Sequence, residues 1–87
     1  MNELDILELR KLYANDMVFL TAHCSLRLDQ RAITEDDIKA ALNNGEIIEQ
    51  YPDDYPWPSC LILGYSNNRP LHICMGSSGE AAKLITA

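Results

Sequence analysis

The feature that most constrains this chain is a change of hydrophobic pattern at Asn44-Gly45. Before it, apolar residues recur at helical spacing, and after it short β-branched runs alternate with turn residues and prolines. The 87 residues suffice for one domain, 1–87. Short links between successive strands require antiparallel pairing. The sequence therefore predicts an α+β fold with N-terminal helices packed on a C-terminal antiparallel sheet of three to four strands.

Two helices are expected before residue 32. In the first, which Asn2 can cap, every third or fourth residue is apolar: Ile6, Leu9, Leu12 and Tyr13. The run 17–20 is apolar but too short to separate an extended link from a brief strand. Thr21 is placed to cap the second helix, 22–31.

The third helix has the clearest signature in the chain. Thr34 and Asp37 resemble a capping box, and the core-facing positions follow at helical spacing: Ile38, Ala41 and Leu42. Asn44-Gly45 predicts a left-handed stop.

Four later segments are typical of strands: Glu46–Tyr51, 59–65, 71–75 and 83–87. The second of these is nearly all apolar, which predicts a central strand covered on both faces. Three prolines make 52–58 a loop, in which Tyr55-Pro56 and Trp57-Pro58 are bonds prone to the cis form.

Charge and cysteine content narrow the classes of function. With 13 Asp and Glu against 7 Lys and Arg, the net charge of −6 repels nucleic acid, so any RNA role needs a local basic patch. The first residues lack the basic and apolar regions of a signal peptide, and no apolar run has a membrane-spanning length. The three cysteines lack framework spacing, which favours reduced thiols in a cytoplasmic protein without a membrane partner.

The second helix concentrates positive charge. His23, Arg27 and Arg31 follow an i, i+4, i+8 spacing and lie in one arc. A histidine with two arginines can hold a phosphate and move a proton. The alternative is an exposed face whose arginines pair with carboxylates such as Asp29 or Glu35.

Two further groups of residues deserve a functional hypothesis. His72 shares a strand face with Cys74, opposite three apolar residues, and is a candidate general acid or base if that face is open. The alternative is a partly buried histidine bonded to a neighbouring strand.

Tyr55 and Trp57 are candidate partner-binding residues, or else their loop folds over the end of the core. The cysteines and histidines lack zinc-ligand spacing, so we expect no metal and no cofactor.

Several of these segments together resemble a known bacterial and archaeal family. They are Thr21-Ala22-His23, Arg27, 31–38, 44–49, 51–54, Pro56, 58–65 and 70–72, and the block Pro58-Ser59-Cys60-Leu61 is specific. The family is catalogued as domain of unknown function 4258, and its members resemble RelE-like and BrnT-like toxins, small ribonucleases encoded beside an antitoxin.

This resemblance implies helices leading into an antiparallel sheet. It also implies acid–base and phosphate-contacting roles for His23, Arg27 and His72, with Arg31 in support. Two departures stand out. The family's Ala-x-x-Arg-Met after the histidine is replaced by 24–28, Cys-Ser-Leu-Arg-Leu, and its later Tyr-x-Pro-Asp segment does not follow Ala87. The second departure makes us expect a C-terminal end trimmed relative to the family.

Two classes of function follow as hypotheses. The first is a metal-independent toxin ribonuclease, with RNA as substrate and an antitoxin protein as partner. The second is a non-catalytic domain that binds a basic partner through its acidic surface and the Trp57 loop. A homodimer built through an exposed edge strand near the C-terminus is compatible with either.

Overall fold

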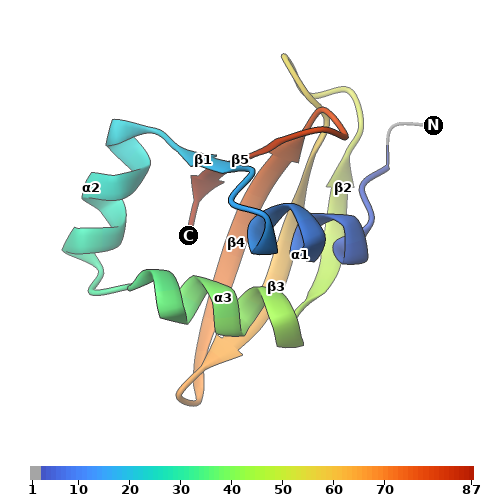
Figure 1. The fold of residues 1–87 in the computed structure, drawn as a ribbon. Helices are drawn as coiled ribbons and strands as arrows, with labels where there is room; N and C mark the ends of the chain where they lie inside the picture. The colour runs from blue at the N-terminus through green and yellow to red at the C-terminus, as the bar shows by residue number, and fades with distance from the viewer. Residues whose placement is uncertain (1–2) are drawn as a thin grey trace.

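The computed structural model describes residues 3–87, which form three helices and one five-stranded sheet (Figure 1). The helices are α1 (Ile6–Ala14), α2 (Ala22–Gln30) and α3 (Glu35–Asn44). The strands are β1 (Val18–Leu20), β2 (Glu46–Tyr51), β3 (Ser59–Ser66), β4 (Arg69–Ser77) and β5 (Ala82–Thr86). The predicted α+β class is confirmed.

The sheet has the strand order β1-β5-β4-β3-β2. Strands β2 to β5 pair antiparallel, as expected, but β1 pairs parallel with β5. The prediction of three to four antiparallel strands was therefore wrong by one strand. Three residues are too few to show a period, so only the tertiary pairing decides that the run at 17–20 contains a strand. Because β1 covers β5, the strand at the end of the chain is not a sheet edge, contrary to expectation.

Local sequence signals fix how the helices begin. Thr21 caps α2, and Thr34 with Asp37 forms the predicted capping box of α3. Helix α1 begins at Ile6 with Asp5 as its cap, since the Asp5 carboxylate accepts from the Leu7 N–H. Asn2, the expected cap, lies outside the described residues.

Helix α3 packs directly on β3. Its buried residues are the three predicted ones, Ile38, Ala41 and Leu42, and α1 adds Leu9 to the same core. Gly64 of β3 lies so close to α3 that a Cβ there would stand 2.0 Å from the Ala41 carbonyl oxygen. Gly45 is extended, with φ −83° and ψ 173°, so the left-handed stop was wrong. The residue must be small because its own Cβ would lie 2.5 Å from the same oxygen.

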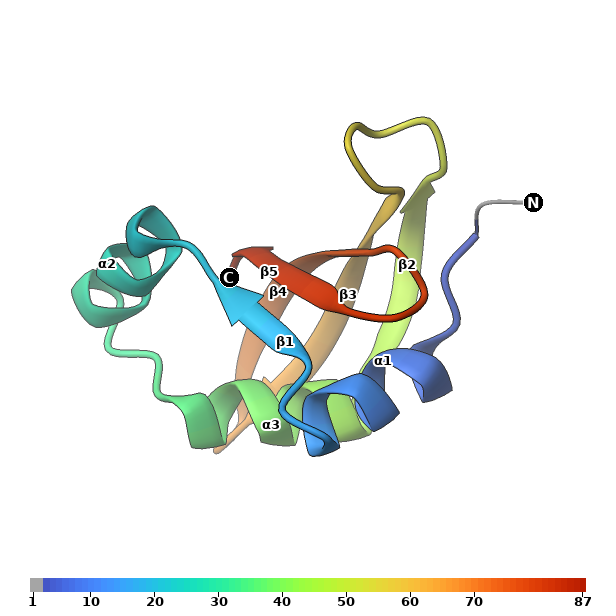
Figure 2. The same ribbon diagram turned by 45° about the horizontal axis from the view of Figure 1, so that its top comes forward.

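Helices α1 and α3 cover one face of the sheet only (Figures 1 and 2). The β3 residues that face them are buried, whereas Leu61 and Leu63 on the other face are half-buried and Tyr65 is exposed. The expectation that β3 is covered on both faces was therefore wrong. We call this second side of the sheet the open face. Loop 52–58 covers one end of it, where Ser59 is buried and donates a hydrogen bond to Asp54. Of the two bonds expected to be prone to the cis form, Tyr55-Pro56 is cis.

Candidate functional site

Helix α2 lies beside the end of β5 and is held there by apolar and polar contacts. Cys24 and Leu28 are buried on its inner side. At the end of the helix the Arg31 guanidinium donates to the Ala87 carbonyl oxygen at 2.6 Å. These contacts fix the rotation of the helix about its axis, and hence the direction in which its other side chains point.

The two flanks of α2 face different parts of the molecule. Ser25 and Asp29 line a hollow together with Thr34 and Glu35 at the start of α3. At about 100° per residue, His23 and Arg27 lie on the opposite flank of the Cys24–Leu28 stripe. They therefore point away from the start of α3.

His72 lies on the open face of β4. It is exposed and stands directly opposite Leu63, while its neighbours Leu71 and Ile73 are buried on the helix side. Directly opposite residues point to the same side of a sheet. The predicted orientation of this strand is thus confirmed, and the partly buried alternative for His72 was wrong.

Arg69 is a cation that the sequence interpretation missed. It begins β4, and its guanidinium donates to the carbonyl oxygens of Arg31 at 2.9 Å and Ala32 at 3.4 Å. The contact ties the end of α2 to the start of β4. The signal was present in the Asn67-Asn68 turn, whose positive φ values of 52° and 65° suit a tight hairpin. A long side chain just after such a turn lies at the tip of the sheet, but its partner depends on tertiary structure.

The candidate side chains are not joined to one another. Within residues 3–87, no hydrogen bond or ion pair links His23, Arg27 or His72 to one another or to a carboxylate. The expected pairing of the arginines with Asp29 or Glu35 does not occur among these residues. The site is therefore an open surface on which the imidazoles and the Arg27 guanidinium have no protein partner in the described part of the chain.

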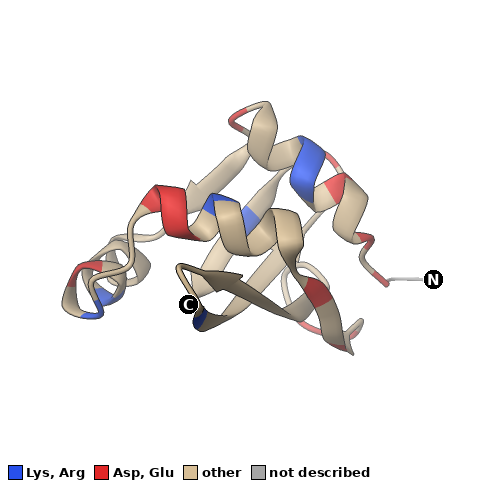
Figure 3. Ribbon diagram, turned by 90° about the horizontal axis from the view of Figure 1, so that it is seen from below, with Lys and Arg blue, Asp and Glu red and all other residues tan. Residues whose placement is uncertain are grey.

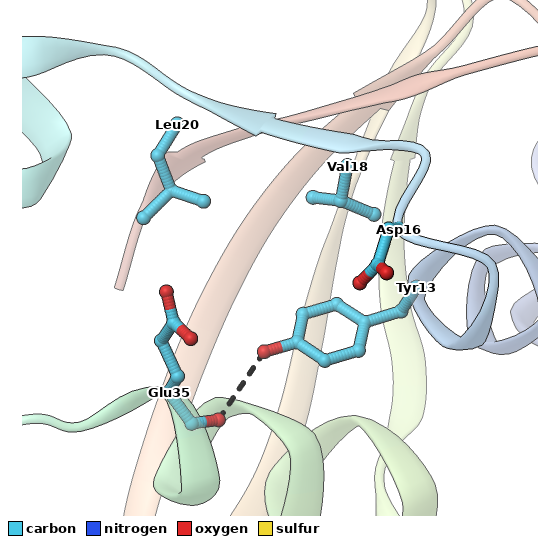
Figure 4. Close-up of a pocket in the computed structure, with 5 residues that line it drawn as sticks. All are labelled: Tyr13, Asp16, Val18, Leu20 and Glu35. Atoms are coloured by element: carbon cyan, nitrogen blue, oxygen red, sulfur yellow. Dashed lines mark hydrogen bonds between the residues drawn. The ribbon is translucent and has the colours of Figure 1, made fainter.

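One hollow, shown in Figure 4, is formed where α1, β1 and α3 meet, and the Tyr13 hydroxyl donates there to the Glu35 carbonyl oxygen at 3.2 Å. Burial, followed by the nearby Glu35 carboxylate, raises the pKa of Tyr13. The walls of this hollow carry two acidic residues, Asp16 and Glu35, so the hollow does not suit a phosphate.

The open face is electrically divided. On β2, Glu46 and Glu49 stand opposite Leu63 and Leu61, so both carboxylates belong to this face. His72 lies on the β4 side of this face, whereas Arg69 stands opposite Ser66, which bonds to Asp37 of α3, and so belongs to the helix side. Figure 3 shows the charged positions along the ribbon, with the acidic start of α3 next to α2. A polyanion is therefore repelled from the β2 side of the face.

The proposed partner-binding loop has one free aromatic ring and one engaged ring. Tyr55 is 95% exposed. Trp57 is half-buried, with the Lys83 ammonium 6.0 Å from its ring centre, a distance typical of a cation–π contact. The half-buried Trp57 agrees with the alternative that the loop folds over the end of the core, whereas Tyr55 projects from the loop into solvent.

The three cysteines are unpaired. Cys24 and Cys60 are buried, and Cys74 is half-buried on the open face. Burial raises the pKa of each thiol. The pKa of Cys60 is raised to about 12, first by burial and then by the charge of the nearby Cys74.

Among residues 3–87 no three side chains of metal-binding type come together. No helix in the described part of the chain is long and apolar enough to cross a membrane.

Comparison with known families places most of the chain in a family. Residues 20–87 match the model described as Domain of unknown function (DUF4258), and the chain belongs to this family. The match includes α2, α3 and β2 to β5, and therefore His23, Arg27, Arg31 and His72, whereas α1 precedes it. Comparison with curated proteins and with solved structures found no match.

Proposed function

We propose that this chain is a metal-independent ribonuclease of the toxin type and that its site lies between α2 and β4. The 2′-hydroxyl oxygen attacks the adjacent phosphorus, and the bond from phosphorus to the 5′ oxygen breaks. One histidine of the pair His23 and His72 removes the 2′-hydroxyl proton, and the other protonates the leaving 5′ oxygen. The products are a 2′,3′-cyclic phosphate and a 5′-hydroxyl. Arg27 and Arg31 contact phosphate oxygens, and Arg27 stabilises the charge that develops.

The observation that carries this proposal is the rotation of α2. Its inner stripe and the hollow at Ser25 turn His23 and Arg27 away from the start of α3. His72 is exposed on the face of the sheet that α3 does not cover, and the proposal joins these two groups of residues in one site. The exposed histidines and the unpaired Arg27 guanidinium supply proton transfer and anion binding without a metal. The resemblance to RelE-like and BrnT-like toxins gives the same reaction class, with a cytoplasmic location and an antitoxin as the protein partner.

The test is cleavage of a labelled single-stranded RNA by the purified chain in the presence of a chelator. We expect products that end in a 2′,3′-cyclic phosphate. Replacing His23 or His72 by Ala lowers the rate by at least about a hundredfold, and replacing Arg27 by Ala does so by a similar factor. Lys39→Ala, an exposed cation on α3, is the matched control and leaves the rate unchanged.

Two outcomes would contradict the proposal. One is the absence of cleavage by a folded chain whose RNA is bound. The other is cleavage that survives both histidine substitutions, since a contaminating nuclease would behave in this way. Expression in cells, with and without the neighbouring gene, then tests the antitoxin: growth arrest should require both histidines and disappear when the neighbour is co-expressed.

The second candidate function, a non-catalytic domain for a basic partner, is favoured by Tyr55. A tyrosine that is 95% exposed beside Asp53 and Asp54 suits a contact with a cationic protein surface. If this is the function, Tyr55→Ala weakens capture of the protein encoded by the neighbouring gene and His72→Ala does not. The ribonuclease proposal predicts no effect of Tyr55→Ala on RNA cleavage.

A further inference from the structure

An aromatic side chain stands next to His72 on the open face. Tyr65 is 50% exposed and lies directly opposite Pro70, two residues before His72 on β4. Tyr65 and His72 are thus diagonal neighbours on one face of an antiparallel pair, about 7–8 Å apart and within reach of an aromatic ring. Among residues 3–87, no other exposed aromatic ring is a direct or diagonal neighbour of His72 in the strand register.

The backbone that carries this ring is held firmly. The side-chain amide of Asn44 accepts from the Tyr65 N–H at 2.9 Å and donates to the Tyr65 carbonyl oxygen at 2.7 Å. The next residue, Ser66, donates to the Asp37 carboxylate at 2.6 Å. Strand β2 pairs with β3 only as far as Leu63, so no strand covers Tyr65 on that side. The half-exposed ring therefore stands at a strand end whose backbone is held by side-chain hydrogen bonds.

From this arrangement we infer that Tyr65 is a base-stacking residue and that the substrate is single-stranded RNA. This inference rests on the proposed function and adds the form of RNA that the site accepts. Unpaired bases stack on aromatic side chains, whereas the bases of a duplex already stack on each other. Beside a phosphate at His72, the base of a single strand can reach the Tyr65 ring.

The charges on the open face set the direction of the strand. The phosphates lie toward α2, near Arg27 and Arg31, because the carboxylates Glu46 and Glu49 repel them from β2. The bases then project over Leu63 and Tyr65. This orientation places the neutral, flat part of the RNA on the apolar part of the face.

The test uses a fluorescent 2′-O-methyl oligonucleotide of about ten nucleotides, which cannot be cleaved because it lacks free 2′-hydroxyls. We expect Tyr65→Ala to weaken binding about tenfold, Tyr65→Phe to retain it, and the matched control Tyr55→Ala to leave it unchanged. A duplex of the same length should bind more weakly than the single strand. Equal affinity of wild type and a folded Tyr65→Ala variant, or tighter binding of the duplex, overturns the inference.

A second measurement does not depend on how the variant folds. In oligonucleotides with one abasic position each, the wild-type chain should lose about tenfold in affinity at a single position. If no abasic position lowers the affinity, the stacking role is overturned.

The two proposals can fail separately. Stacking without cleavage of ordinary RNA would contradict the ribonuclease proposal alone. Cleavage that persists with equal binding by Tyr65→Ala would contradict the stacking inference alone. Preferential binding of a basic peptide with no RNA binding would overturn both.

Discussion

At the scale of single residues, the open face contains one strongly perturbed phenol. The hydroxyl of Tyr51 donates to the Glu49 carboxylate two residues earlier on β2. This hydrogen bond, followed by burial and by the Glu49 charge, raises the pKa of Tyr51 to about 12. The bond also fixes the direction of the carboxylate, which is one of the two that repel phosphate from the β2 side.

We predict that Glu49→Gln lowers the pKa of Tyr51 toward its ordinary value of 10.0. The neutral amide removes both the strong acceptor and the negative charge that oppose ionisation of the phenol. Nuclear magnetic resonance of the tyrosine ring carbons against pH measures the change, and Tyr51→Phe identifies the signal. An unchanged titration in Glu49→Gln would show that Glu49 is not the cause.

At the scale of elements, the contact between α3 and β3 controls the geometry of the open face. Gly64 and Ala41 meet backbone to backbone, and Asn44 at the end of α3 holds the Tyr65 backbone. Asp37 at the start of α3 joins the capping box to Ser66 at the end of β3. The helix is thus fixed to the strand at both of its ends.

We predict that Gly64→Ala destabilises the protein by about 3 kcal/mol or prevents folding, because its Cβ would meet the Ala41 backbone. Gly76→Ala on β4 is the matched control. The nearest atom to a Cβ there is 3.4 Å away, so the cost should be about 1 kcal/mol or less. Urea denaturation measures both. Equal stability of the two variants would contradict the close α3–β3 contact.

The start of α3 should make stability depend on pH in the acid range. The hydrogen bond from Ser66, then those from Thr34, lower the pKa of Asp37 below its ordinary 3.8. The unfolded chain therefore takes up this proton first as pH falls. The stabilisation is fully present above 3.8 and is lost as pH falls through the lowered folded pKa.

Asp37→Asn should accordingly be less stable than wild type at neutral pH, and the difference should shrink in acid below 3.8. Asp36→Asn, one residue earlier and without these bonds, is the control. Urea denaturation across a pH series gives the free energies of unfolding. A difference between Asp37→Asn and wild type that stays constant with pH would contradict the assigned role of the carboxylate.

At the scale of the whole molecule, much of the fold could be predicted because its signals are local. The Thr34–Asp37 box, the Asn67-Asn68 turn and the alternation around His72 each depend on neighbouring residues. Strand β1 could not be predicted, since its pairing with β5 joins segments more than sixty residues apart. Gly45 was misjudged because its small size serves packing against α3 rather than a left-handed turn.

The candidate site could be predicted only as a set of residues. The spacing of His23, Arg27 and Arg31 places them on one arc, and the strand pattern of His72 places it on an open face. Whether the arc turns toward that face depends on how α2 packs beside β5, which no local pattern contains. Arg69 and Tyr65 escaped notice for the same reason, since their importance comes from Arg31, Asn44 and the register with β4.

The central claim is that α2 and β4 form one RNA site, and the most direct measurement follows the imidazole signals of both histidines by nuclear magnetic resonance. The wild-type chain is titrated with the uncleavable single-stranded oligonucleotide, and His23→Ala and His72→Ala assign the two signals. We predict that both signals shift together and saturate at the same RNA concentration. A shift of only one histidine, or of neither while the RNA binds, would contradict a single site between α2 and β4.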